Sequence, residues 1–413
     1  MRADAPRAGA RPRSTVGATD HPMPATDYAA ALGIGVAAAY IGAGLGARRR
    51  RGWSEIYALC LAVVLWTVYA CSATLYHTSP GSIRVSSFFV LHLAFAALVF
   101  AFPTAVWGGM ALDTRSRRRL ETRLQPASKL AWPVAWLLAF LSVVVVGAAI
   151  YAHEIEPLRL SVTRLELRTP KLRAGERPLR IVHLTDLHLE PSRVSAAIRA
   201  RLLSEVTALQ PDLVLWGGDY VSDWDGVPAA QRLLVEASRQ ARLGGCAVAG
   251  NWPADRGVLE FPAGTKGAPA VLSNAKALVR TAEGEVYVVG VPYTDPSPDR
   301  AQAERGVPAG AFRVLLAHSP REAVGVHGYD LILCGHTHGG QLHVPGWQRV
   351  ARRFAQAPYA AGRYDLSGQL LYVNRGVGLE GGAAPRLRFR CPPEVLVVDV
   401  VGTGPVAEAS RGG

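Results

Sequence analysis

The chain is poor in cysteine, with five in 413 residues, and no two of them form a C-x-x-C pair. Cys60 and Cys71 lie in an apolar segment, Cys246 and Cys334 end apolar runs, and Cys391 stands alone before two prolines. Because no regular spacing is present, the sequence does not indicate a disulfide framework. We expect these cysteines to be buried free thiols.

The C-terminal half lacks the basic excess that the overall net charge of +13 suggests. Residues 1–177 contain 21 Lys and Arg against 10 Asp and Glu, a net charge of +11, whereas residues 178–413 contain 24 against 22, a net charge of +2. The basic residues therefore accompany the hydrophobic half, where membrane topology explains them better than a DNA-binding face does. We expect no nucleic-acid partner.

Four long apolar segments lack the polar stripe that the helices of a soluble bundle show. Each segment reaches the ~20 residues that a helix needs to cross the hydrocarbon core of a bilayer. The sequence therefore predicts a transmembrane helical domain over residues 28–151, which follows a disordered arm at residues 1–27. The four predicted spans are 28–47, 53–75, 86–112 and 130–151.

The loops between the spans predict the orientation of the chain. Arg48–Arg51 is a run of four arginines, and residues 113–129 carry five arginines and Lys129, whereas the loop after the second span carries only Arg84. The positive-inside rule makes the two basic loops cytoplasmic. We therefore expect a multi-pass protein of the cell membrane whose C-terminal domain is extracytoplasmic.

From residue 154 onward, short apolar runs alternate first with amphipathic helices and then with one another. The predicted strands are 160–167, 180–184, 213–216, 246–248, 277–279, 286–291, 312–317, 331–333, 370–373 and 394–400, and the predicted helices are 194–209 and 228–242. This order predicts an α/β sandwich of mixed sheets flanked by helices over residues 152–402, with a flexible tail at 403–413.

Five of these strands end in side chains of the kinds that bind metals. They are Asp186 with His188, Asp219, Asn251, His318, and His336 with His338. Taken singly, each is an ordinary helix cap, turn signal or core histidine. Together they place seven oxygen and nitrogen donors at the carboxyl ends of strands, where ligands collect in α/β layers. Seven donors with one shared carboxylate suit two metals ~3.5–4 Å apart.

The order D-x-H, G-D, G-N, H and G-H-x-H resembles the signature of the calcineurin-like metallophosphoesterases, over residues 154–401. The sequences HLTDLHL, GGDYV, GHTHGGQ and NRGVG are similar to its membrane-associated bacterial branch, which includes phosphodiesterases and UDP-2,3-diacylglucosamine hydrolases. The resemblance implies a four-layer α/β/β/α fold and a dinuclear site for two divalent metal ions of the Mn, Fe or Zn type.

The resemblance also implies a role for each residue. Two cations would activate a water that attacks phosphorus in line and would neutralise charge on the phosphoryl oxygens. The implied substrate is a phosphodiester or phosphomonoester, such as a lipid-linked or cell-envelope precursor, and Asp219, Asn251 and His336 are expected to take part in catalysis. Asp186, His188 and His338 would hold one metal, Asn251, His318 and His336 the other, and Asp219 would bridge them.

One position departs from the family's pattern, which usually places a histidine directly after the asparagine. Here Trp252 follows Asn251. An indole N–H donates a hydrogen bond but does not act as a general acid, and loss of an acid–base group typically costs ~10²–10⁴ in rate. Asp255 and His343 are candidates for a replacement proton donor. The alternative hypothesis is a membrane-anchored metal-binding or sensory protein with little or no turnover.

Overall fold

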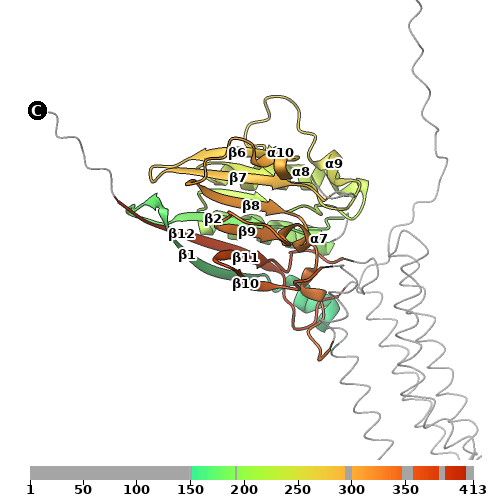
Figure 1. Cartoon of the computed structure of the whole chain (residues 1–413). Helices are drawn as coiled ribbons and strands as arrows, with labels where there is room; N and C mark the ends of the chain where they lie inside the picture. Colours follow the sequence, from blue (N-terminus) through green and yellow to red (C-terminus); the bar gives the residue numbers. More distant parts are fainter. Residues whose placement is uncertain are drawn as a thin grey trace, which may run out of the picture. The chain divides into compact units, whose positions relative to one another are not determined.

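Two six-stranded β-sheets lie face to face in the computed structural model of the chain (Figure 1). The structure describes Ala148 and residues 151–405, except 191–192, 294–299, 347–356 and 381–386. The chain divides into two units, residues 1–139 and 140–413, and every described residue belongs to the second.

The predicted N-terminal arm and the four predicted spans lie outside the described residues, apart from Ala148 and Tyr151 at the end of the fourth span. Among the residues that the structure describes, no helix is both long and apolar enough to cross a membrane. The segment that leads into the sandwich consists of two short helical turns, η2 (Tyr151–Ile155) and η3 (Glu156–Leu158).

The first sheet contains parallel strands, and its central strand, Leu213–Trp216, is buried on both faces. Its order is β1 (Ser161–Arg173), β12 (Glu394–Gly404), β2 (Leu179–Leu184), β3 (Leu213–Trp216), β4 (Gly245–Ala247) and β5 (Ala270–Val271). The strands β2 to β5 run parallel, and β12 runs antiparallel to β2. Near-continuous apolar runs such as LVLW in β3 are typical of parallel strands covered on both sides.

The second sheet has a parallel centre with an antiparallel hairpin at each edge. Its order is β10 (Gly362–Leu366), β11 (Gln369–Val373), β9 (Leu331–Cys334), β8 (Phe312–Ala317), β7 (Glu285–Val291) and β6 (Ala275–Arg280). The edge strand β10 was absent from the sequence prediction, because its residues GRYDL are mostly polar and only half-buried.

Three apolar layers make up the core, and the side chains of each central strand alternate between two of them. In β2, Ile181 faces the second sheet, whereas Val182 and Leu184 face the helices α7 (Arg193–Leu209) and α8 (Val227–Gln240). The outer face of the second sheet is covered by the short helices α10 (Arg300–Glu304) and η5 (Pro320–Ala323). The layers therefore follow the α/β/β/α order, with a thin last layer.

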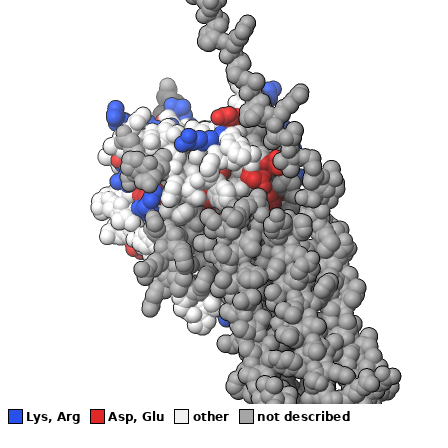
Figure 2. Space-filling view, turned by 90° about the vertical axis from the view of Figure 1, so that its right-hand side faces the viewer, with Lys and Arg blue, Asp and Glu red and all other residues white. Residues whose placement is uncertain are grey.

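The carboxyl ends of the parallel strands in both sheets meet at one edge. The side chain of Asn374, which follows β11, donates to the carbonyl of His183 in β2 over 3.1 Å. The N–H of His336, which follows β9, donates to the carboxylate of Asp186 after β2. Both contacts join the two sheets. On the face shown in Figure 2, the basic side chains of the described residues lie in separate small groups.

Candidate metal centre

The backbone at most of the candidate ligands adopts a conformation that residues other than glycine rarely take. The angle φ is 53° at Asp186, 43° at His188, 54° at Asp219, 70° at His336 and 50° at His338. Residues in this left-handed region are strained, and they persist where the surrounding structure fixes them, most often at functional sites. Five of the seven candidates are held in this way.

Two glycines leave room for the aspartates. A Cβ atom at Gly250 would overlap the carboxylate of Asp219, and a Cβ atom at Gly335 would overlap that of Asp186. The glycines of the G-N and G-H pairs are therefore required by the close approach of two loops to buried carboxylates. Any larger residue would displace a candidate ligand.

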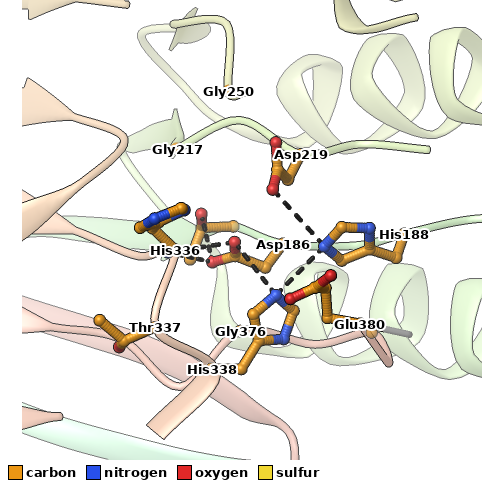
Figure 3. A network of polar contacts seen from close by, with 12 residues as sticks. Asp186, His188, Gly217, Asp219, Gly250, His336, Thr337, His338, Gly376 and Glu380 are labelled. Carbon is orange, nitrogen blue, oxygen red and sulfur yellow. Dashed lines mark hydrogen bonds and ion pairs between the residues drawn. The ribbon is translucent and has the colours of Figure 1, made fainter. Parts of the chain in front are cut away.

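The first group of donors contains Asp186, His188 and His338, which are all buried. The Nε2 atoms of His188 and His338 are 3.1 Å apart, and His338 Nε2 lies 3.5 Å from Asp186 Oδ1. Figure 3 shows the two imidazoles and the carboxylate pointing toward one another. Two nitrogens at this separation match a pair of ligands that each lie ~2.0–2.1 Å from one metal ion.

The second group contains Asp219, His318 and His336, and Asn251 lies against it. His318 Nε2 lies 3.0 Å from Asn251 Oδ1, 3.2 Å from His336 Nδ1 and 3.4 Å from Asp219 Oδ2. Carboxylate, amide and imidazole donors together suit Mn, Fe or Zn. The structure thus brings all seven of the candidate residues into two neighbouring groups.

Asp219 lies between these groups. Its Oδ2 atom is 3.6 Å from His188 Nε2 in the first group and 3.4 Å from His318 Nε2 in the second. One carboxylate oxygen therefore faces donors of both groups, which is the position of a bridging ligand. Figure 3 shows the side of this arrangement that faces His188.

Burial and neighbouring charges raise the pKa values of two candidate ligands. Burial raises the pKa of Asp186 to about 7, with a smaller contribution from the charge of Asp219 and an opposing one from His318. Burial alone would lower the pKa of His318, but the carboxylates of Asp219 and Asp186 outweigh it and raise that pKa to about 10. A divalent cation would take over the role that the histidine proton plays beside Asp219.

Asp255, which the sequence suggested as a replacement proton donor, binds backbone N–H groups instead. Its buried carboxylate accepts the N–H groups of Asp219 at 2.6 Å, Tyr220 at 2.8 Å and Gly250 at 2.8 Å. Both oxygens are therefore occupied by backbone donors, and Asp255 fixes the G-D loop against the G-N loop. The other proposed proton donor, His343, contacts the carbonyl of Gly339 instead.

Trp252 lies at the edge of the first group. Its ring makes an edge-to-face contact with His188, with the centroids 5.7 Å apart, and its backbone N–H donates to Asp219 Oδ1 over 3.2 Å. The side chain that replaces the usual histidine is thus adjacent to the donors. Its indole places an apolar ring on this side of the centre.

Gln341, which ends the motif GHTHGGQ, and Glu380 were assigned no role from the sequence, and both support this edge of the site. Gln341 is buried, and its amide holds the backbone of Glu380 through bonds of 2.9 and 3.0 Å. Figure 3 shows Glu380 beside His338. A glutamine that follows two glycines and a glutamate in a loop carries no metal-site pattern, so the sequence alone could not have connected them.

Comparison with known proteins shows relatives over this part of the chain. A family model described as calcineurin-like phosphoesterase matches residues 179–340. The chain is 31% identical over 273 residues to phosphodiesterase YaeI of Escherichia coli, which covers 61% of this chain and 92% of that protein. It is 26% identical over 308 residues to UDP-2,3-diacylglucosamine pyrophosphatase LpxG of Chlamydia muridarum, covering 60% of this chain and 92% of that one.

A third relative extends further along the chain. It is a transmembrane protein with a metallophosphoesterase domain from Danio rerio, and it is 27% identical over 354 residues. The alignment covers 80% of this chain and 77% of that protein.

Proposed function

Because the chain belongs to the calcineurin-like metallophosphoesterase family, whose members are metal-dependent phosphohydrolases, we propose that it is a membrane-anchored phosphoesterase with two metal ions. The observation that carries this proposal is the position of Asp219. Its Oδ2 atom lies 3.4–3.6 Å from a histidine nitrogen in each of two donor groups. A shared carboxylate between two ligand sets is the arrangement that a two-metal hydrolase requires.

The ligand sets follow from the two groups. Asp186, His188 and His338 would hold one ion, Asn251, His318 and His336 the other, and Asp219 would bridge them. When bound, two such cations lower the pKa of a water that can attack phosphorus and neutralise charge on the phosphoryl oxygens. The protein fixes the positions of the donor atoms before substrate binds, since the backbone at five of them is strained and the loops that carry them are buried.

Membrane anchoring and the substrate class belong to the same proposal. The hydrophobic segments over residues 28–151 and the transmembrane relative from Danio rerio support anchoring. The names of two relatives, a phosphodiesterase and a UDP-2,3-diacylglucosamine pyrophosphatase, support a phosphoester substrate that is linked to a lipid. We propose an extracytoplasmic catalytic domain that acts on such a substrate at the membrane.

The direct test is hydrolysis of bis(p-nitrophenyl) phosphate by the full chain in detergent, loaded with Mn²⁺. We expect turnover that EDTA abolishes and that Asp219→Asn lowers by at least ~10³-fold, because two metal sites depend on this side chain. Asp225→Asn, which changes an exposed carboxylate of the neighbouring loop, is the matched control and should leave the rate unchanged. Absence of turnover with two metals bound would instead support the sensory alternative.

A further inference from the structure

Tyr293 and Arg321 lie beside the second donor group and have no role in the ligand sets above. The ring centroid of Tyr293 is 5.4 Å from that of His336 and 5.9 Å from that of His318. The guanidinium carbon of Arg321 lies 4.7 Å from the centroid of the same tyrosine ring. The tyrosine thus connects a permanent positive charge to the edge of the candidate metal centre.

The backbone on both sides of this contact is fixed. The N–H of Tyr293 donates to the carbonyl of Ala249 over 3.0 Å, which ties the end of β7 to the loop that carries Asn251. The hydroxyl of Ser319, directly after His318, accepts the N–H of Arg321 over 3.3 Å and caps η5. Arg321 is therefore held three residues from a candidate ligand by a short, capped turn.

The guanidinium of Arg321 also reaches solvent. Its side chain is 33% exposed, and its Nε and Nη2 atoms lie 3.4 and 3.3 Å from Glu322 Oε1, which is longer than the ~2.7–2.9 Å of a strong charge-assisted hydrogen bond. Arginine presents five N–H donors in a planar fork. The same side chain can therefore contact Tyr293 with its face, and its solvent-exposed part can bind an anion in addition to the contact with Glu322.

The first donor group has an uncharged aromatic neighbour instead. There the indole of Trp252 lies against His188, and it carries no charge. A substrate that spans both donor groups would meet an apolar ring on one side and a guanidinium on the other. The site is thus polarised, and an anionic part of the substrate is favoured on the side of His318 and His336.

We propose that Arg321, positioned by Tyr293, is a specificity-determining residue that binds a second phosphate of the substrate beside the ester that is cleaved. This inference rests on the proposed function and deepens it, because it assigns the substrate class as phosphoesters with a further phosphate. Bidentate pairing between guanidinium and phosphate oxygens is the interaction that the arginine supplies. Tyr293 acts through Arg321, so it is a positioning residue.

A matched pair of substrates tests this proposal. Thymidine 5′-(p-nitrophenyl phosphate), with and without a 3′-phosphate, contains the same scissile ester and differs by one phosphate. We expect Arg321→Gln to raise KM for the 3′-phosphorylated substrate ~10-fold with kcat within about twofold, since uniform binding is lost. The substrate without the 3′-phosphate should be unaffected, and Arg321→Lys should fall between wild type and Arg321→Gln.

Two further variants serve as controls. Arg280→Gln removes an exposed arginine that pairs with Glu285 at 3.6 Å and lies outside the turn that carries Arg321, and it should leave both KM values unchanged. Tyr293→Phe keeps the ring that supports Arg321 and should resemble the wild type, whereas Tyr293→Leu should reproduce part of the Arg321→Gln effect. An equal change for both substrates in Arg321→Gln, or no change for either, would overturn the proposal.

Equilibrium binding separates this inference from the proposed function. Metal-loaded full chain is titrated with thymidine 3′,5′-bisphosphate and with thymidine 5′-monophosphate. We expect tighter binding of the bisphosphate to the wild type and loss of that preference in Arg321→Gln. A wild type without this preference contradicts the role of Arg321 even if it hydrolyses esters. A protein that shows the preference but has no turnover contradicts only the hydrolase function.

Discussion

The presence of Trp252 in place of a histidine affects which leaving groups the site can accept. Its ring lies beside His188, and the carboxylate of Asp255 is occupied by three backbone N–H groups. Neither residue offers a general acid to the departing oxygen. A site built in this way should favour esters whose leaving group is a weak base and needs no proton.

We therefore expect the wild type to cleave p-nitrophenyl esters well and alkyl esters poorly. Trp252→His should raise the rate on alkyl esters by up to ~10²-fold and the rate on nitrophenyl esters much less, because only the alkoxide requires protonation. Trp252→Phe, which keeps an aromatic ring without an acid, is the control and should show no selective gain. Comparable wild-type rates on both ester types, unchanged by the histidine, would contradict this explanation.

The raised pKa values of two candidate ligands predict how metal binding responds to pH. The pKa values of about 7 for Asp186 and about 10 for His318 are both raised, so each group is at least partly protonated at pH 7. A metal ligand must release its proton, so affinity should rise from pH 6 to pH 8. Calorimetric titration with Mn²⁺ in two buffers of different ionisation enthalpy should show release of at least one proton. Metal affinity that is independent of pH, with no dependence of the binding enthalpy on the buffer, would contradict proton release from these ligands.

At the scale of elements, Asp255 joins the loops after β3 and β4. One carboxylate accepts three backbone N–H groups, one of them from Asp219 itself. Removal of a buried acceptor leaves its donors unsatisfied, at a cost of ~1–3 kcal/mol for each group. Without the Asp255 carboxylate, the two loops that carry Asp219 and Asn251 should no longer be fixed relative to each other.

Asp255→Ala should lower the unfolding free energy by about 3–4 kcal/mol and weaken metal binding, because three buried donors lose their acceptor and local relaxation recovers only part of the cost. Denaturant unfolding and metal titration of the same preparation measure both effects. The exposed Asp225→Ala is the control and should change stability by less than about 0.5 kcal/mol. Unchanged stability in Asp255→Ala would show that the three hydrogen bonds are not formed.

Most central elements were predictable because their apolar runs have a clear period and end in glycine or a polar turn. The runs at 213–216 and 312–317 correspond to β3 and β8 without any shift. The polar edge strand β10 and the five-residue α10 were missed, since neither carries a periodic apolar pattern. The seven candidate residues could be named from their types and order, whereas the contacts of Asp255, Tyr293 and Arg321 depend on tertiary structure.

At the scale of the whole molecule, the charge distribution predicts the side of the membrane on which the catalytic domain lies. The two arginine-rich loops, Arg48–Arg51 and residues 113–129, are expected in the cytoplasm, which leaves the domain outside. A reporter that works only in the cytoplasm, fused after Gly413, should be silent, and an alkaline phosphatase fusion at the same point should be active. The reverse pair of signals would contradict the orientation.

Asp219 is expected to bridge two metal ions in each chain. Elemental analysis together with electron paramagnetic resonance of the Mn²⁺-loaded full chain tests it most directly. We predict two manganese ions per chain and an exchange-coupled spectrum, because the ions share one carboxylate, with loss of the coupling in Asp219→Asn and no change in Asp225→Asn. One ion per chain, or two ions with the spectrum of isolated manganese, would contradict the account.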